Sequence, residues 1–150
     1  MGLLGNENPV VRTSGARGII CVGTSLDSRE VTRGLRRLFA RDPLLFQYTL
    51  KWVPIDLWTL SDMDSIKAAT KKLSTRITVG DKWRMTVEKR RYAQYHKIEI
   101  ITELATLIEA KVDLEKPDKI LRVDIIGKYA GLAVLRPLDV FSLAKPYEEI

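Results

Sequence analysis

Cysteine and histidine are almost absent from this chain of 150 residues, since each occurs once, as Cys21 and His96. A single cysteine cannot close a disulfide within the chain and cannot build a cysteine-rich zinc site. No second histidine accompanies His96, which argues against a histidine-based metal site as well. We therefore expect no bound metal and a reducing, cytoplasmic location.

The motifs of common catalytic sites are also missing. The chain has no glycine-rich dinucleotide fingerprint and no Walker-type phosphate loop. VGTSLDS, at residues 22–28, could hold a phosphate weakly, but we interpret it as a helix N-terminus capped by Asp27 or Ser28. Cys21 and His96 remain an alternative nucleophile pair, although Cys21 falls in an apolar predicted strand, where thiols are usually unreactive. We predict a protein with no catalytic activity and no cofactor.

Long apolar runs are lacking too. No stretch approaches the ~20 residues that a membrane-spanning helix needs, so we expect no membrane association. The N-terminal segment MGLLGNENPVVRTSGARG has no apolar centre of the kind that marks a signal peptide. Asn6 occupies the position where a myristoylation signal carries serine or threonine, so acylation of Gly2 is not expected. We expect residues 1–15 to form a flexible tail.

Positive charge, by contrast, is present in excess and is concentrated in one segment. The chain has 25 Lys and Arg against 19 Asp and Glu, a net charge of +6. From Lys67 to Lys97, ten cations face only Asp81 and Glu88, so this segment carries +8 and the rest of the chain carries −2. Such a surface attracts polyanions through phosphate contacts and counterion release. The alternative is an ordinary solvated face.

Hydrophobic periodicity predicts strand, helix, strand, helix, strand, helix and then a hairpin, which indicates an α/β fold with a mixed sheet. Helices are predicted to begin near Asp27, Ser61 and Ile98, where apolar residues take up helical spacing. Gly127 and Lys128 suit a two-residue hairpin turn. The predicted strands cover residues 18–23, 46–58 (one long strand or two), 82–88, 120–126 and 129–135.

Three local predictions accompany this order of elements. The apolar run at residues 18–23 is typical of a buried strand. Ser61 and Asp64 have the spacing of a capping box at the start of the second helix. The buried face of the third helix is predicted from four apolar residues at helical spacing, namely Ile98, Ile101, Ala105 and Ile108.

The connection between the third predicted strand and the third helix concentrates side chains that suit RNA. Its sequence, KRRYAQYHK, occupies residues 89–97. Lysine and arginine contact phosphates, and Arg90 suits a bidentate contact. Tyr92, Tyr95 and, more weakly, His96 could stack on unpaired bases, although both tyrosines could instead pack against the sheet edge. The predicted RNA-binding residues are Lys71, Lys82, Arg84, Lys89, Arg90, Arg91, Tyr92, Tyr95, His96 and Lys97.

Two segments of the sequence resemble the THUMP domain. They are KWRMTVEKRRYAQYHKIEIITELATLIE, at residues 82–109, and VDLEKPDKILRVDIIGKYAGLAVL, at residues 112–135. Together they follow the family's order of a strand ending in basic residues, an amphipathic helix, a V-D-L-x-x-P-D turn, and a strand and hairpin containing a glycine. The resemblance implies a THUMP-like RNA-binding domain at residues 61–145, preceded by a short ferredoxin-like α/β lead-in at residues 16–60.

The resemblance also implies a partner and a role. THUMP domains occur in thiouridine synthases, RNA methyltransferases and pseudouridine synthases, where they recognise tRNA, in several cases through its acceptor end. Those enzymes carry a fused catalytic domain, for which 150 residues leave no room, so the chain is similar to the stand-alone adaptor that helps an acetyltransferase form N4-acetylcytidine in tRNA. We expect a non-catalytic tRNA-binding adaptor. A general binder of structured RNA such as ribosomal RNA, or a small enzyme using Cys21 or His96, are the alternatives.

Overall fold

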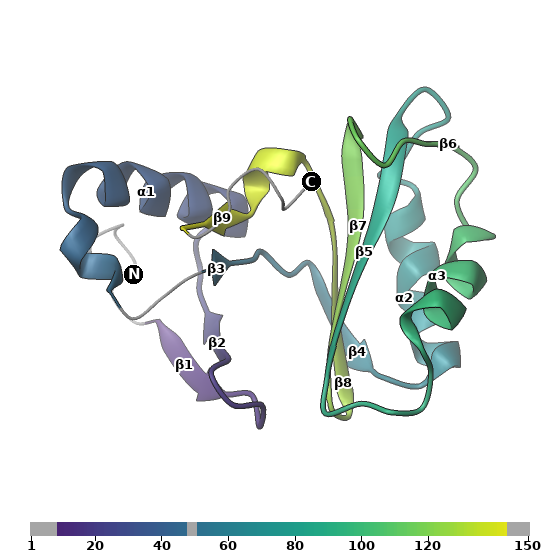
Figure 1. Cartoon of the computed structure of the whole chain (residues 1–150), viewed down its shortest axis with the longest axis horizontal. Coiled ribbons are helices and arrows are strands. Elements are labelled where there is room, and N and C mark those ends of the chain that lie inside the picture. Colours follow the sequence, from purple (N-terminus) through teal and green to yellow (C-terminus); the bar gives the residue numbers. More distant parts are fainter. Residues whose placement is uncertain (1–8, 48–50, 144–150) are drawn as a thin grey trace.

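A five-stranded mixed sheet with two helices on one face organises most of the protein (Figure 1). Residues 9–47 and 51–143 are described by the structure, which is a computed structural model. The elements follow in the order β1 (Val10–Thr13), β2 (Ile20–Gly23), α1 (Ser28–Arg41), η2 (Pro43–Phe46), β3 (Lys51–Trp52), β4 (Leu57–Leu60), α2 (Met63–Ser74), β5 (Lys82–Arg90), α3 (Lys97–Ala105), β6 (Lys111–Val112), β7 (Lys119–Ile126), β8 (Tyr129–Leu135), η3 (Pro137–Asp139) and β9 (Phe141–Ser142).

The main sheet has the strand order β4-β8-β7-β5-β6. β5 pairs in parallel with β6 and β7, whereas β8 pairs antiparallel with β7 and β4. The parallel pair needs a crossover, which α3 supplies, and the antiparallel pair is closed by the predicted turn at Gly127 and Lys128. Gly127 has a φ of +58°, which glycine adopts at little cost. The predicted α/β fold with a mixed sheet is confirmed.

The main core lies between this sheet and the helices α2 and α3. Alternation along β5 directs Trp83, Met85 and Val87 into the core, and all three are buried. The predicted face of α3 is only partly correct: Ile101, Ala105 and Ile108 pack against the core, but Ile98 is 68% exposed. Ile100 and Leu104, which were not predicted, are fully buried. Apolar residues occupy more than one face of α3, so spacing alone does not select the face that meets the sheet.

Aspartates cap the N-termini of α1 and α2. Asp27 caps α1 by accepting hydrogen bonds from the backbone N–H groups of Arg29 and Glu30, as predicted. The predicted capping box of Ser61 and Asp64 is wrong, because Asp62 is the cap of α2 and accepts from the Ser65 N–H at 2.9 Å. The Ser61 hydroxyl instead donates to the Gly127 carbonyl, which ties the start of α2 to the β7–β8 turn.

The segment before α2 contributes to three sheets rather than one. β2 pairs with β1, β3 pairs with β9, and β4 is an edge strand of the main sheet. The predicted extended segment at residues 46–58 thus contains two strands in different sheets, separated by Pro54, while residues 48–50 fall outside the described part. The predicted boundaries at residues 16, 61 and 145 stay a prediction, and the pairing of β3 with β9 crosses the middle one.

Two predictions for the N-terminal region need correction. Part of the predicted flexible tail forms β1, which pairs with β2 over four residues because its extended backbone finds a partner there. The apolar run at residues 18–23 is a strand over Ile20–Gly23, but it is not buried, since β2 belongs to a two-stranded sheet and Ile20 is 58% exposed. Hydrophobicity alone did not distinguish a core strand from a surface hairpin.

A second, smaller core holds α1 against the C-terminal strand. Phe39, Phe46 and Phe141 pack edge-to-face or tilted, with ring centroids 5.7–5.9 Å apart. The Arg36 guanidinium lies 5.6 Å from the Phe141 ring centroid and donates to the carbonyls of Leu138 and Val140.

Across residues 9–47 and 51–143, no helix is long and apolar enough to cross a membrane.

Candidate nucleic-acid interface

The three consecutive cations at the end of β5 point in different directions. The Lys89 ammonium donates to the Tyr95 carbonyl at 3.0 Å, and this bond links the two ends of the connection between β5 and α3. Arg90, the last residue of β5, is exposed, and its side chain has no hydrogen bond or ion pair to any residue that the structure describes. Arg91 is also exposed and donates to the Gly15 carbonyl in the turn between β1 and β2. Arg90 is therefore the cation best placed to accept a new anionic partner.

The two tyrosines of the connection face the protein rather than the solvent. Tyr92 donates its hydroxyl hydrogen bond to the Ser61 carbonyl at 2.8 Å, and its ring packs against the main core. Burial raises the pKa of the Tyr92 hydroxyl above its usual value. Tyr95 packs against the same core. Both tyrosines are partly buried and pack against the core, as in the alternative reading of the sequence, and their role in base stacking stays a prediction.

His96 and Lys97 begin α3 beside the basic connection. His96 is the N-cap residue, and its backbone N–H donates to the Glu99 carboxylate at 3.3 Å. Lys97 is exposed and lies 3.5 Å from the Glu88 carboxylate. An ion pair between two exposed side chains is worth little, so Lys97 remains available to a stronger anion.

The ten predicted residues do not form one continuous site. Seven of them lie between Lys89 and Lys97, whereas Lys82 and Arg84 lie at the start of β5. A strand rises about 3.3 Å per residue, which puts Lys82 about 26 Å from Arg90. Lys71 belongs to the last turn of α2, which begins beside the β7–β8 turn and runs toward the end of the sheet where Lys82 lies. Basic side chains thus stand at both ends of the sheet.

The end of the sheet near Lys82 holds further cations that the sequence did not single out. A hollow of about 250 Å³ lies there, where β8 ends. Its charged lining consists of Arg29, Arg33, Arg76, Lys119 and Arg136 with one carboxylate, Asp139. These residues are up to 110 positions apart in the sequence, so no local pattern could have grouped them.

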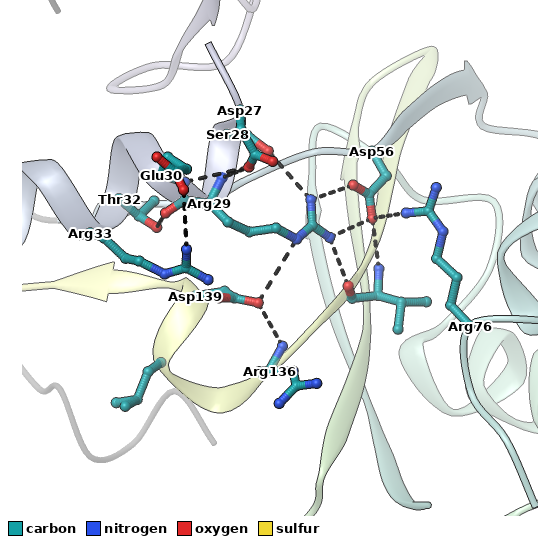
Figure 2. Close-up of polar contacts among 12 residues, drawn as sticks. Asp27, Ser28, Arg29, Glu30, Thr32, Arg33, Asp56, Arg76, Arg136 and Asp139 are labelled. Carbon is teal, nitrogen blue, oxygen red and sulfur yellow. Dashed lines mark hydrogen bonds and ion pairs between the residues drawn. The ribbon is translucent and has the colours of Figure 1, made fainter. Parts of the chain in front are cut away.

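Asp56 neutralises part of this charge (Figure 2). Its carboxylate accepts two hydrogen bonds from the Arg29 guanidinium, at 2.6 and 2.8 Å, and one from the Val134 N–H at 3.0 Å. Arg76 approaches the same carboxylate at 3.0 Å. Burial raises the pKa of Asp56, but the hydrogen bonds from Arg29 and Val134 and the charges of Arg29 and Arg76 outweigh it and hold the pKa below its usual value. Arg29 and Asp56 therefore act as structural partners that fix α1 to β8.

The sequence model of the THUMP domain matches residues 61–135, which is half of the chain. The chain belongs to the THUMP-domain family. The matched THUMP region runs from the residue before the α2 cap to the end of β8, and it contains all ten predicted RNA-binding residues. Arg29, Arg33 and Arg136 lie outside it, so the basic hollow joins the THUMP domain to its flanking segments. THUMP domains are associated with RNA binding in tRNA-modification proteins.

Solved structures are similar to this THUMP protein at low sequence identity. PH1313 from Pyrococcus horikoshii Ot3 has the same fold over 87% of this chain, with a TM-score of 0.62 at 13% identity. The THUMP domain of THUMP domain-containing protein 1 matches 47% of this chain and 81% of its own, with 24% identity and a TM-score of 0.42. TrmN from Thermus thermophilus matches 73% of this chain, with 16% identity and a TM-score of 0.46.

The present chain spans 43% of the length of PH1313 and 43% of that of TrmN. No curated protein matches the sequence significantly.

The alternative nucleophile pair of Cys21 and His96 finds no support in this THUMP fold. Cys21 belongs to β2, and His96 caps α3 on the other side of the main sheet (Figure 1). Burial also raises the pKa of the Cys21 thiol, which makes its nucleophilic thiolate scarcer at neutral pH. The two side chains are not positioned to act together.

Proposed function

We propose that this protein binds tRNA through the connection between β5 and α3 of its THUMP domain. The observation that carries the proposal is the group of three exposed cations, Arg90, Arg91 and Lys97, at one end of the main sheet. Arg90 has no partner among the described residues, so binding a phosphate there breaks no existing contact. The family's association with RNA binding in tRNA-modification proteins favours tRNA over other polyanions.

An extended polyanion fits the charge distribution better than a small anion does. Lys82 lies about 26 Å along β5 from Arg90, and the basic hollow lies near the Lys82 end of the sheet. A single phosphate cannot contact both ends, whereas a folded RNA presents phosphates over such a distance. Structured RNA of another kind, such as ribosomal RNA, has the same backbone chemistry and is the alternative partner.

We further propose that the protein has no catalytic activity and acts as an adaptor that presents tRNA to a modifying enzyme. The separation of Cys21 from His96 across the sheet supports the first part. The second part rests on the resemblance to the stand-alone THUMP adaptor, and formation of N4-acetylcytidine by an acetyltransferase is the reaction that this resemblance favours.

The binding proposal is tested by the single substitution Arg90→Ala. We expect weaker tRNA binding and a salt dependence whose slope falls by just under ~1, because one phosphate contact is lost. The melting temperature should not change, since Arg90 is exposed and unpaired among the described residues. Fluorescence anisotropy over a salt series measures the binding constants.

The matched control is Arg37→Ala, which removes one exposed arginine from α1. Equal losses in the two variants would show that net charge alone matters, and the proposed interface would be wrong. Parallel titrations with intact tRNA, tRNA trimmed of its CCA end, duplex RNA and DNA decide between tRNA and general structured RNA.

A further inference from the structure

A hollow of about 630 Å³ opens at the end of the sheet where β7 turns into β8. Four segments that are distant in the sequence line it: the turn between β1 and β2, Ser61 between β4 and α2, the connection from β5 to α3, and the β7–β8 turn. Its apolar surface comes in part from Ile126 and Ala93, and Tyr129 forms part of its wall.

Tyr129 presents an aromatic ring that the fold leaves accessible. It is the first residue of β8 and is 58% exposed, whereas Tyr92, the other tyrosine of the lining, is packed and hydrogen-bonded to Ser61. Its hydroxyl has no hydrogen-bond partner among the described residues. An exposed ring next to an apolar hollow suits stacking, because every nucleobase has a flat π-face.

Charged and amide groups line the same hollow. Arg91 and Lys128 are exposed and supply two positive charges. Arg91 uses one N–H on the Gly15 carbonyl, and a guanidinium has five N–H donors, so others remain for a phosphate. Gln94 adds an exposed amide, which can both donate to and accept from the edge of a base.

We propose that this hollow receives one unpaired nucleotide of the bound RNA, with its base stacked on Tyr129 and its phosphate held by Arg91 and Lys128. The inference rests on the proposed RNA-binding function and adds to it a single-stranded feature of the ligand. It also moves base stacking away from Tyr92 and Tyr95, the residues that the sequence had suggested, to a tyrosine on the neighbouring hairpin.

The test uses two RNA hairpins that differ only in a three-nucleotide unpaired extension. The extension carries 2-aminopurine, whose fluorescence falls when the base stacks. We expect wild-type protein to bind the extended hairpin more tightly and to quench the probe. Tyr129→Ala should weaken binding of the extended hairpin by roughly five-fold or more, which corresponds to loss of one stacked base. Binding of the blunt hairpin should not change, and Tyr129→Phe should behave as wild type.

Leu60→Ala is the matched control, because Leu60 is opposite Tyr129 in the sheet, is similarly exposed and does not line the hollow. Absence of quenching by wild-type protein, or equal losses for both hairpins in Tyr129→Ala, would overturn the inference while RNA binding itself stood. If wild-type protein bound neither hairpin nor tRNA, the proposed function would fail and the inference with it. The quenching measurement needs no variant, so it decides the question even if Tyr129→Ala does not fold.

Discussion

Arg91 occupies a backbone conformation that favours glycine, since its φ is +55°. The residue lies where the chain leaves β5, beside the β7–β8 turn, in which the Gly127 N–H donates to the Arg90 carbonyl at 2.9 Å. A non-glycine residue pays a steric penalty in this region because its Cβ crowds the backbone. The side chain that causes this penalty also reaches the Gly15 carbonyl and the hollow next to Tyr129. Glycine would relieve the strain at this position but has no side chain to make the contact with Gly15.

Substitutions of Arg91 separate its backbone from its side chain. Arg91→Ala and Arg91→Gly both remove the guanidinium, but only alanine retains a Cβ at a positive φ. We therefore expect Arg91→Ala to have a free energy of unfolding about 1 kcal/mol lower than Arg91→Gly, while both variants weaken RNA binding to the same extent. Urea denaturation and anisotropy measure the two effects. Equal stabilities would mean that the positive φ is not maintained in solution.

At the same scale, the sequence identified the basic residues but not their roles. KRRYAQYHK was correctly placed between a strand and a helix, because alternation before it and helical spacing after it are strong signals. The sequence could not tell that Lys89 would bind its own loop, or that Tyr92 would be turned inward by a bond to Ser61. Those outcomes depend on which segment lies opposite, and Ser61 is 31 residues away.

Helix α1 is attached to the main sheet through Arg29, which contacts both Asp56 and β8. The Arg29 guanidinium, in the first turn of α1, donates to Asp56 and to the Val134 carbonyl, so the helix start is joined to β8 by charge-assisted bonds. The Asp56 side chain is 9% exposed, and removing one partner of such a pair leaves the other poorly solvated. This pair is the main polar connection that we find between α1 and the THUMP region.

The substitution Asp56→Asn should lower the free energy of unfolding by about 3 kcal/mol at neutral pH. Because the folded-state pKa of Asp56 is held below its unfolded value, the stabilisation is fully present above the usual aspartate pKa of ~3.9 and is lost as the pH falls through the folded-state pKa. The difference between wild type and variant should therefore stay constant from pH 7 to about pH 4 and shrink below it. Urea unfolding across that range measures it.

Glu30→Gln serves as the comparison, since it breaks an exposed pair with Arg33 at 3.7 Å that should contribute almost nothing. A difference between wild type and Asp56→Asn that grew on acidification would contradict the assigned direction of the pKa.

The turn after β6 is an element whose structure the sequence did predict. Asp113 accepts hydrogen bonds from the N–H groups of Glu115 and Lys116, at 3.0 and 2.9 Å, and these bonds hold its pKa below the usual value. Aspartate followed by a proline-containing polar stretch is a local turn signal, and local signals survive folding. We expect Asp113→Ala to lower the melting temperature and Asp113→Asn, which keeps an acceptor oxygen, to lower it less. Unchanged stability with lost RNA binding would instead make Asp113 an RNA contact.

Other elements could not be assigned from the sequence alone. The face that α3 buries depended on the sheet, because Ile98, Ile100 and Ile101 put apolar groups on several sides of one helix. The sequence also could not predict which strands pair with β3 and β4. β3 pairs with β9, about 90 residues later, and nothing in a two-residue strand specifies such a partner. Long-range pairing of short strands is decided by packing, not by propensity.

On the scale of the whole molecule, one basic segment of the sequence becomes two basic ends of a sheet. The run from Lys67 to Lys97 includes α2 and β5, so its cations are spread along both elements rather than gathered at one point. The fold then adds Arg29, Arg33 and Arg136 to one end. Net charge per segment predicted a polyanion-binding protein, which stays a proposal, and only the fold shows that the positive charge lies at both ends of the sheet.

The absence of catalysis is a prediction for the protein as a whole. Purified protein incubated with unmodified tRNA and the common group donors should yield no new nucleoside in mass spectrometry. Addition of an acetyltransferase that depends on an adaptor should yield N4-acetylcytidine if the adaptor proposal holds. Repeated turnover by the protein alone would contradict it.

If one RNA contacts both basic ends of the sheet, substitutions at the two ends should reduce the salt slope of its binding additively. Lys71→Ala with Lys82→Ala removes two exposed cations that have no ion pair among the described residues. We expect this double variant to reduce the salt slope of tRNA binding by just under ~2. Adding Arg90→Ala should bring the reduction to just under ~3, since Arg90 is about 26 Å from Lys82, has no hydrogen bond or ion pair with Lys71 among the described residues, and the effects of independent sites add. The control is Arg37→Ala with Arg41→Ala on α1, which removes the same charge from exposed positions. If the Lys71 and Lys82 double variant matched this control while Arg90→Ala alone weakened binding, the RNA would occupy only the end of the sheet at Arg90, and the second basic end would serve another purpose.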